Sequence, residues 1–262
     1  MTLPQEPVFS LLKDHFVVGW DNIAGEDYVG ASHGYTCEES AVGTTNGAGP
    51  RNTQMFILSP DGIVLHCLPG FWHPDDLAFE LEFARVMARL WQDKRSKQDK
   101  RALFVRMHQR AIRTAPKAMV VRSAWQGFDA NHERERLEQG PRDTFYYDQD
   151  GEPAGLKPLN VLLHERMAAR PFVAFKNFDT ATFVDYGRPY YDNNAHIDGI
   201  GVTFGTEGYM DSQKRMAERA KKRAEVKRRA AEYEGKKPQT EKLKTRRKPK
   251  QKKSTSRPTG KK

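Results

Sequence analysis

The chain has 262 residues, of which 37% are hydrophobic and 10% aromatic, which is enough apolar material for a packed core in one large or two small domains. Its formal net charge of +10 is unevenly distributed, because residues 211–262 hold 22 of the 44 Lys and Arg but 6 of the 34 Asp and Glu. The first 210 residues are therefore mildly acidic, and a polyanionic partner is expected to bind only the tail.

The cysteine content argues against a secreted, disulfide-stabilised protein. Cys37 and Cys67 are the only two cysteines, too few for a disulfide framework. The opening MTLPQEPVFS lacks the basic and then apolar pattern of a signal peptide, and no apolar run approaches the roughly 18 residues of a membrane span. These features predict a protein of the reducing cytoplasm that makes no membrane contact.

The N-terminal third begins with a short helix. Val8, Leu11 and Leu12 have helical spacing within residues 6–15, and the apolar run from Phe16 to Trp20 predicts a buried strand. Residues 21–52 are rich in Gly, Ser, Thr and Asn and predict a long loop. Loops of this length in compact domains are usually functional or disordered, so this loop is a candidate site.

Residues 53–71, TQMFILSPDGIVLHCLPGF, predict a β-hairpin. Pro60, Asp61 and Gly62 are the residue types that close a tight turn between two apolar strands. Neither strand alternates cleanly between apolar and polar residues, so both faces are expected to be covered by helices. Pro69 and Gly70 then break the second strand.

Helices are predicted after the hairpin. Residues 74–92 begin with Pro74 at a first-turn position, followed by two aspartates that favour a helix N-terminus, and they carry two apolar stripes. Residues 103–112 predict a second helix, and residues 117–125 a short strand or extended docking segment.

The next regions are less regular. Residues 132–155 predict a polar linker anchored by Phe145-Tyr146-Tyr147, and residues 157–186 predict two short helices around Pro171. Residues 187–209 are rich in Gly and Asn, and their glycines do not form a phosphate-binding loop.

The C-terminal tail predicts a charged helix over residues 211–233 and disorder from residue 235 onward. Its basic clusters would neutralise phosphates without reading base sequence, which fits RNA, DNA or the ribosome as a partner. A merely solubilising extension is the alternative. The candidate nucleic-acid-binding residues are Lys221, Lys222, Arg223, Lys227, Arg228, Arg229, Arg246, Arg247 and Lys248.

Within the first loop, Cys37-Glu38-Glu39-Ser40 has C-x-x-S spacing, the one-thiol version of a redox motif. A helix N-terminus and His33 would favour the Cys37 thiolate, whereas the two adjacent glutamates would oppose it. An ordinary exposed or structural cysteine is the alternative.

The hairpin and the helix after it, TQMFILSPDGIVLHCLPGFWHPDDLAFEL, resemble the second half of a thioredoxin-like domain over about a quarter of the chain. The resemblance implies that residues 16–20 form an earlier strand of the same sheet and that Cys37 occupies the region of the redox cysteine. Thr53 stands near the position of the family's cis-proline. Cys67 would lie on the active-site side of the sheet, where a redox pair with Cys37 is conceivable.

A metal site was also considered for His33, Cys37, His66, Cys67 and His73, because thiolate and imidazole are ligands of zinc and copper. Their spacing is not diagnostic, and the adjacent strand residues His66 and Cys67 point to opposite faces. The sequence therefore predicts neither a metal ion nor a cofactor.

Together these features predict an α/β protein. A thioredoxin-like sheet with flanking helices (residues 1–95) is followed by a mainly helical and loop-rich extension (96–210), a charged helix (211–234) and a disordered basic tail (235–262). The expected function is single-thiol disulfide exchange by Cys37 with a protein disulfide substrate, with Ser40, Thr53 and Cys67 in the same site. The alternative is a non-catalytic thioredoxin-like scaffold whose tail binds nucleic acid or the ribosome.

Overall fold

The structure is a computed structural model that describes residues 2–23, 25–33, 44–192, 225 and 228, with only the backbone of residues 31–33 and 192. The described residues up to 192 belong to one compact unit, and residues 225 and 228 belong to a second unit. The mixed α/β class predicted from the sequence is confirmed. No helix in the described ranges has both the length and the apolar composition needed to cross a bilayer.

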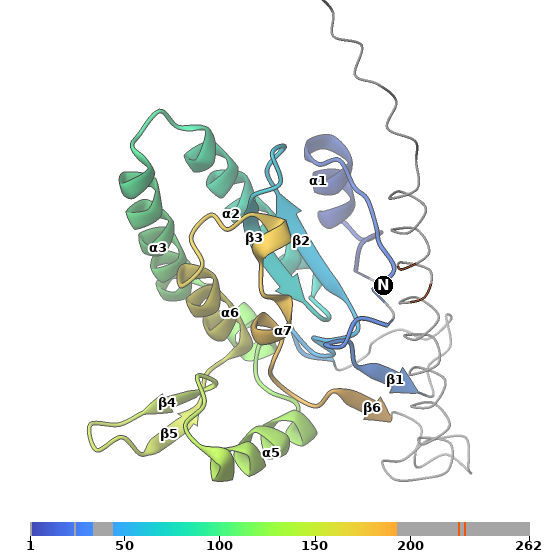
Figure 1. The fold of residues 1–262 in the computed structure, drawn as a ribbon, viewed down its shortest axis with the longest axis vertical. Helices are drawn as coiled ribbons and strands as arrows, with labels where there is room; N and C mark the ends of the chain where they lie inside the picture. Colours follow the sequence, from blue (N-terminus) through green and yellow to red (C-terminus); the bar gives the residue numbers. More distant parts are fainter. Residues whose placement is uncertain (1, 24, 34–43, 193–224, 226–227, 229–262) are drawn as a thin grey trace, which may run out of the picture. The chain divides into compact units, whose positions relative to one another are not determined.

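The central element is the predicted hairpin (Figure 1). Strand β2 (Gln54–Leu58) pairs antiparallel with β3 (Val64–Pro69), and every residue of β3 is buried. Gly62 has a φ of 78° in the connecting turn, a conformation that favours glycine. Helix α2 (Pro74–Gln92) follows over the predicted range and packs against β3.

The large thioredoxin-like sheet is not confirmed. In the described part of the chain, β2 and β3 pair only with each other, and one isolated bridge joins Ile63 to Ala174. The predicted strand over residues 16–20 is wrong, because this segment follows helix α1 (Val8–His15) as unpaired chain. Val17 and Trp20 are 103% and 91% exposed. The residues have a high strand propensity, but they do not pair with any strand among the described residues.

Two further helices pack together and contribute to the core. Helix α3 (Lys97–Thr114) begins earlier than predicted, because the Ser96 hydroxyl accepts a hydrogen bond from the Asp99 amide and caps it. Helix α6 (Leu159–Ala168) precedes Pro171 as predicted and packs against α3 and β3. Figure 1 shows α3 and α6 side by side, so elements from both halves of the unit share one core.

The prediction for residues 117–125 is wrong, because α4 (Lys117–Arg122) is a helix. The expected linker contains helix α5 (Gly127–Arg136), a 3-10 turn η1 (Leu137–Gln139) and a hairpin of β4 (Phe145–Tyr147) with β5 (Pro153–Leu156). The aromatic anchor is confirmed at its first position, since Phe145 is buried.

The region after α6 has little regular structure. Between Pro171 and residue 186 the regular elements are a 3-10 turn η2 (Phe175–Asn177) and the four-residue helix α7 (Thr180–Phe183), which is shorter than the second helix predicted there.

The two Gly- and Asn-rich loops meet in their described parts. Strand β1 (Ala31–His33) pairs in parallel with β6 (Tyr190–Asp192). The Gly49 amide donates to the Tyr191 hydroxyl at 2.7 Å, and the Tyr186 hydroxyl donates to the Gly47 carbonyl at 3.1 Å. These contacts fix the ends of the chain's irregular segments to each other.

One asparagine anchors the first of these loops to the core. The Asn46 side-chain amide donates to Asp76 at 2.7 Å, and its carbonyl oxygen accepts from the His73 amide at 2.8 Å. Arg122 binds the same carboxylate of Asp76 with two hydrogen bonds. A Cβ at position 70 would lie 2.3 Å from the Ala48 carbonyl oxygen. The loop can therefore lie this close to the end of β3 only because residue 70 is a glycine.

Candidate metal centre

Four polar side chains lie together inside the hydrophobic core. His66 comes from β3, Glu80 from α2, His108 from α3 and His164 from α6, and none of them is more than 2% exposed. Each lies on the buried face of its helix or strand, where the neighbouring residues are mostly apolar. Glu80, for example, follows Leu77 by three residues and precedes Ala84 by four, so it lies within the buried stripe of α2.

The four side chains form a continuous chain of contacts. One carboxylate oxygen of Glu80 is 2.8 Å from Nε2 of His66, and the other is 3.2 Å from Nε2 of His164. Nδ1 of His164 is in turn 2.8 Å from Nδ1 of His108. Glu80 thus stands between two imidazole nitrogens, while His108 contacts the far side of one of those rings.

Aromatic rings enclose this cluster. The Phe83 ring makes edge contacts with His66, His108 and His164, with centroids 5.4, 4.8 and 5.0 Å away. The rings of His66 and His164 stack at 5.2 Å with an angle of 18° between their planes. The imidazoles are therefore held in place by apolar packing as well as by hydrogen bonds.

The charges of the cluster do not balance when all three imidazoles are neutral. Burial by itself raises the pKa of Glu80, but the charge and hydrogen bond of His164 and the hydrogen bond of His66 lower it to about 2. Burial lowers the pKa of His66 and also, well below its usual value, that of His108. The lowered pKa of Glu80 therefore depends on positive charge at its imidazole partners, and no Lys or Arg in the described ranges bonds to it.

The donor set suits a transition-metal ion. His66, Glu80 and His164 each offer one ligand atom, and these three atoms lie within 4.8 Å of one another. Ligand atoms about 2.0 Å from a tetrahedral ion are about 3.3 Å apart. The two imidazole nitrogens lie 2.8 and 3.2 Å from different oxygens of Glu80, so a small rotation of the carboxylate would be needed for one oxygen to share an ion with both. Two imidazoles and one carboxylate form a typical zinc ligand set, and a fourth ligand would come from water.

His108 has the place of an outer-sphere partner. A histidine that binds a metal ion through Nε2 usually donates its Nδ1–H to a neighbouring acceptor, which fixes the ring. For His164 that neighbour is Nδ1 of His108. The arrangement therefore contains both the ligands and a group that orients one of them.

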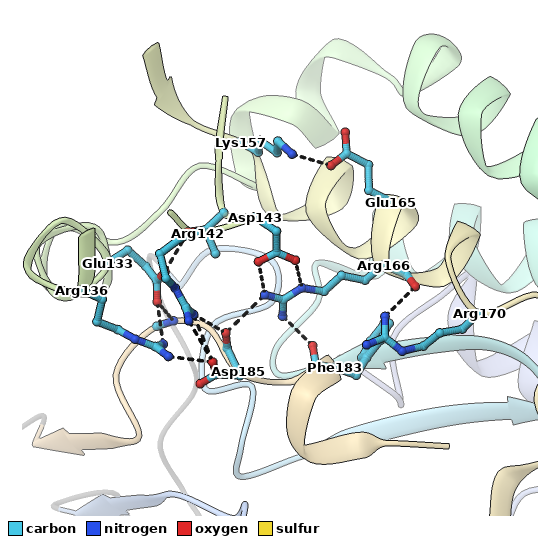
Figure 2. A network of polar contacts seen from close by, with 12 residues as sticks. Glu133, Arg136, Arg142, Asp143, Lys157, Glu165, Arg166, Arg170, Phe183 and Asp185 are labelled. Atoms are coloured by element: carbon cyan, nitrogen blue, oxygen red, sulfur yellow. Dashed lines mark hydrogen bonds and ion pairs between the residues drawn. The ribbon is translucent and has the colours of Figure 1, made fainter. Parts of the chain in front are cut away.

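A second polar cluster lies nearer the surface, between α5, β4 and the segment after α7 (Figure 2). The Asp185 carboxylate accepts hydrogen bonds from Arg51 at 2.7 Å, Arg136 at 2.6 Å and Arg142 at 3.1 Å. Burial raises the pKa of Asp185, but these arginines, Arg136 foremost, hold it below its usual value. Each carboxylate here has a guanidinium partner.

Glu133 and Arg166 extend this second cluster. Glu133 is fully buried and accepts hydrogen bonds from Arg136, Arg142 and Thr144. Arg166 lies 6% exposed and binds Asp143 through two hydrogen bonds of 2.7 Å, while also donating to the main-chain carbonyls of residues 183 and 185. Among the described residues the carboxylates of this network all have hydrogen-bond partners, and Arg51 Nε is its one buried nitrogen without a partner.

The predicted thiol site is not brought together in the described part of the chain. Cys37 and Ser40 lie outside the described residues, as does the question of whether Cys37 pairs with Cys67. Thr53 is exposed directly before β2. Cys67 is a free, fully buried cysteine, and burial raises its pKa well above the usual value, so its thiol is protonated.

The predicted nucleic-acid-binding residues are also mostly outside the described ranges. Arg228 alone among them is described, as an exposed helical residue. Binding of the tail to nucleic acid or the ribosome stays a prediction.

The sequence pattern placed His66 among the candidate metal ligands, but together with Cys67, His73 and other residues close to it in the chain. Glu80 and His164 were missed because they lie 14 and 98 residues further along. A signal was present, however. His66 lies within Leu-His-Cys-Leu, Glu80 within Phe-Glu-Leu and His164 within Leu-Leu-His, so each is a polar residue inside an apolar run.

Comparison with protein-family models, curated proteins and solved structures finds no match to this chain. The thioredoxin-like resemblance of residues 53–81 is therefore neither supported nor opposed by a relative. Function has to be argued from the geometry of the centre itself.

Proposed function

We propose that the protein binds one divalent transition-metal ion, with Zn²⁺ as the best fit, through His66, Glu80 and His164. The observation that carries this proposal is the Glu80 carboxylate, which is fully buried and placed between two imidazole nitrogens. Its pKa is lowered mainly by the charge and hydrogen bond of His164, so an ionised Glu80 needs positive charge beside it. A divalent cation at this point supplies that positive charge in place of a proton on an imidazole.

A proton on His164 is the competing source of positive charge. It would make a buried imidazolium–carboxylate pair with Glu80 at 3.2 Å and would leave the second carboxylate oxygen bonded to His66. The metal-bound form has one advantage over this pair, because it engages both imidazoles and the carboxylate with a single ion. The two forms differ in a measurable property, since only one of them contains a stoichiometric metal ion.

The proposed ion has a structural role. All three ligands are at most 2% exposed, so a substrate has no direct access to them. The ligands come from β3, α2 and α6, and the ion would therefore hold a late segment of the chain against an early hairpin. When the free concentration of the ion is about 1,000 times its dissociation constant, binding stabilises the folded state by about 4 kcal/mol.

The direct test is metal analysis of the untagged full-length protein, followed by replacement with Co²⁺. We expect about one Zn²⁺ per chain and, for the Co²⁺ form, visible absorption typical of a four-coordinate site. His164→Asn should lose both signals. His73→Asn is the matched control, because His73 lies at the N-cap of the same α2 helix but outside the cluster.

A wild-type protein that contains no metal ion and shows no Zn²⁺ binding at micromolar concentrations in a calorimetric titration would overturn the proposal. This measurement uses only the wild type and does not depend on whether a core variant folds. Retention of the Co²⁺ spectrum by His164→Asn would equally exclude the proposed ligand set.

A further inference from the structure

Helix α3 and the residues at its two ends carry a concentration of positive charge that the average composition of the first 210 residues conceals. Residues 94–117 hold nine Lys and Arg but one acidic residue, Asp99. All of the nine cationic side chains except Lys100 are exposed. The acidic residues that give the first 210 residues their negative average therefore lie outside this segment.

Three of the arginines form one stripe along the helix. Arg106, Arg110 and Arg113 are four and three residues apart, so at about 100° per residue they lie within about 60° of one another. The buried residues of α3 lie on the opposite face, where the helix packs against α2 and α6. Figure 1 shows α3 at the outer edge of the compact unit, with α6 beside it. The arginine stripe therefore faces away from the core.

The stripe has no counter-charge in the part of the chain that the structure describes. None of its three guanidinium groups forms a hydrogen bond or an ion pair with a described residue. Arg122 and Arg166, by contrast, each bind one carboxylate through two hydrogen bonds. Like charges three and four residues apart destabilise a helix. A negatively charged partner would relieve this repulsion.

The composition of the exposed face favours phosphate groups as that partner. All three side chains of the stripe are arginines, whose planar guanidinium groups bind a phosphate through two parallel hydrogen bonds. None of the large apolar side chains of α3 is exposed. Protein interfaces usually contain aromatic or aliphatic anchors, and helices that bind a membrane surface insert an apolar face. An acidic protein and an anionic membrane are therefore poorer fits than a nucleic acid.

We infer that α3 binds duplex DNA, with Arg106, Arg110 and Arg113 contacting its phosphates. A helix with its side chains is about 10–12 Å across and fits the major groove of B-form DNA, about 12 Å wide, whereas the major groove of A-form RNA is too narrow. A single strand fits less well, because α3 exposes no aromatic ring on which bases could stack. Such contacts give affinity and orientation without reading base sequence.

The experiment measures binding of the full chain to a fluorescein-labelled DNA duplex of about 20 base pairs, by fluorescence anisotropy between about 50 and 200 mM KCl. For the variant Arg106→Gln/Arg110→Gln/Arg113→Gln, we expect the dissociation constant at about 100 mM KCl to rise at least tenfold. The dependence of log K on log salt should become shallower by about 2.7, because each lost phosphate contact removes about 0.9 from the slope. Glutamine keeps the helix preference of arginine, so the variant should fold like the wild type.

Lys13→Gln/Arg134→Gln/Lys176→Gln is the matched control. It removes the same charge from exposed positions on α1, α5 and η2, and its dissociation constant should stay within about twofold of the wild-type value, because charges beyond a Debye length are screened. The basic tail is present in all three proteins, so its contribution cancels in the comparison.

Three results would contradict the inference. One is a wild-type chain that does not bind the duplex at protein concentrations up to about 100 µM. Another is an α3 variant whose affinity and salt slope equal those of the control, which would leave all binding to residues outside the stripe. The third is tighter binding of an RNA duplex of the same sequence, with the same loss in the α3 variant, which would assign the stripe to RNA.

Discussion

The two polar clusters of the compact unit differ in how their charges are balanced. Around Asp185, three arginines surround one carboxylate, and the neighbouring Glu133 and Asp143 have guanidinium partners too. Around Glu80, the hydrogen-bonding partners found among the described residues are both imidazoles, and burial disfavours the protonated form of His66.

This difference separates a structural network from a binding site. A structural role is enough to account for a carboxylate beside several arginines, because the ion pairs and hydrogen bonds stabilise one arrangement of the elements. A carboxylate between histidines in an apolar core leaves a positive charge to be supplied. Charge balance, rather than the mere presence of buried polar groups, therefore points to the centre at Glu80.

The largest expected effect tests the charge of that centre. Glu80→Gln keeps the size of the side chain but removes its negative charge, so we expect Zn²⁺ affinity to fall by about a thousandfold, or about 4 kcal/mol. Isothermal titration calorimetry measures this change. Glu82→Gln, on the same helix but exposed and paired with Arg85, should bind Zn²⁺ like the wild type. Equal affinities of the two variants would exclude Glu80 as a ligand.

The next effect concerns the second cluster. Arg166→Ala removes two hydrogen bonds to Asp143 and two to main-chain carbonyls, and we expect the free energy of unfolding to fall by about 3 kcal/mol. Urea denaturation measures it. Lys157→Ala, which breaks a single pair with the more exposed Glu165, should cost less than about 1 kcal/mol. Similar losses for both would show that the Arg166 network contributes little.

A third prediction uses pH. Burial raises the pKa of Asp129 in the folded state to about 6, although the Arg188 amide and the Tyr191 hydroxyl donate to it. The folded protein therefore holds this proton more tightly than the unfolded chain does, and the resulting stability is present below about pH 4 and lost as pH rises through about 6.

Asp129→Asn should remove this dependence. Relative to the wild type, the variant should gain about 2 kcal/mol between pH 4 and pH 7, as measured by denaturation at each pH. Asp150→Asn, in the exposed turn between β4 and β5, should follow the wild-type curve. Parallel curves for wild type and Asp129→Asn would mean that Asp129 is already ionised throughout.

The smallest effect sharpens the role of His108. His108→Phe keeps an aromatic ring beside Phe83 and Phe104 but removes the contact with His164. If His108 orients that ligand, Zn²⁺ affinity should fall about tenfold while the ion remains bound at one per chain. The Co²⁺ spectrum should shift rather than disappear. An unchanged affinity and spectrum would make His108 an ordinary core residue.

Local structure was the part that the sequence could predict. Helix α2 follows from Pro74, two acidic first-turn residues and its apolar stripes, and the hairpin follows from Gly62 and the residues before it. These signals act within a few residues, so no tertiary information is needed. The helix at residues 117–122 was not predicted because it is short, and an apolar run of that length does not distinguish a helix from a strand.

Long-range structure was not predictable in the same way. The run at residues 16–20 has the composition of a buried strand, and nothing in it reveals whether the chain provides a neighbour for it. The centre at Glu80 depends on a histidine 84 residues further along, which only the packing of α6 brings near. Each of the three residues has a local signal, as a polar residue within an apolar run, but no local pattern shows that the three lie together.

Helix α6 also sets the order in which the chain can be completed during synthesis. Eight of its ten residues are buried, among them His164 and Arg166, one in each polar cluster. Until residues 159–168 leave the ribosome, β3 and α3 lack the surface against which they pack. More than half of the chain is thus translated before its core can be completed, so apolar side chains of β3 and α3 remain uncovered until α6 emerges.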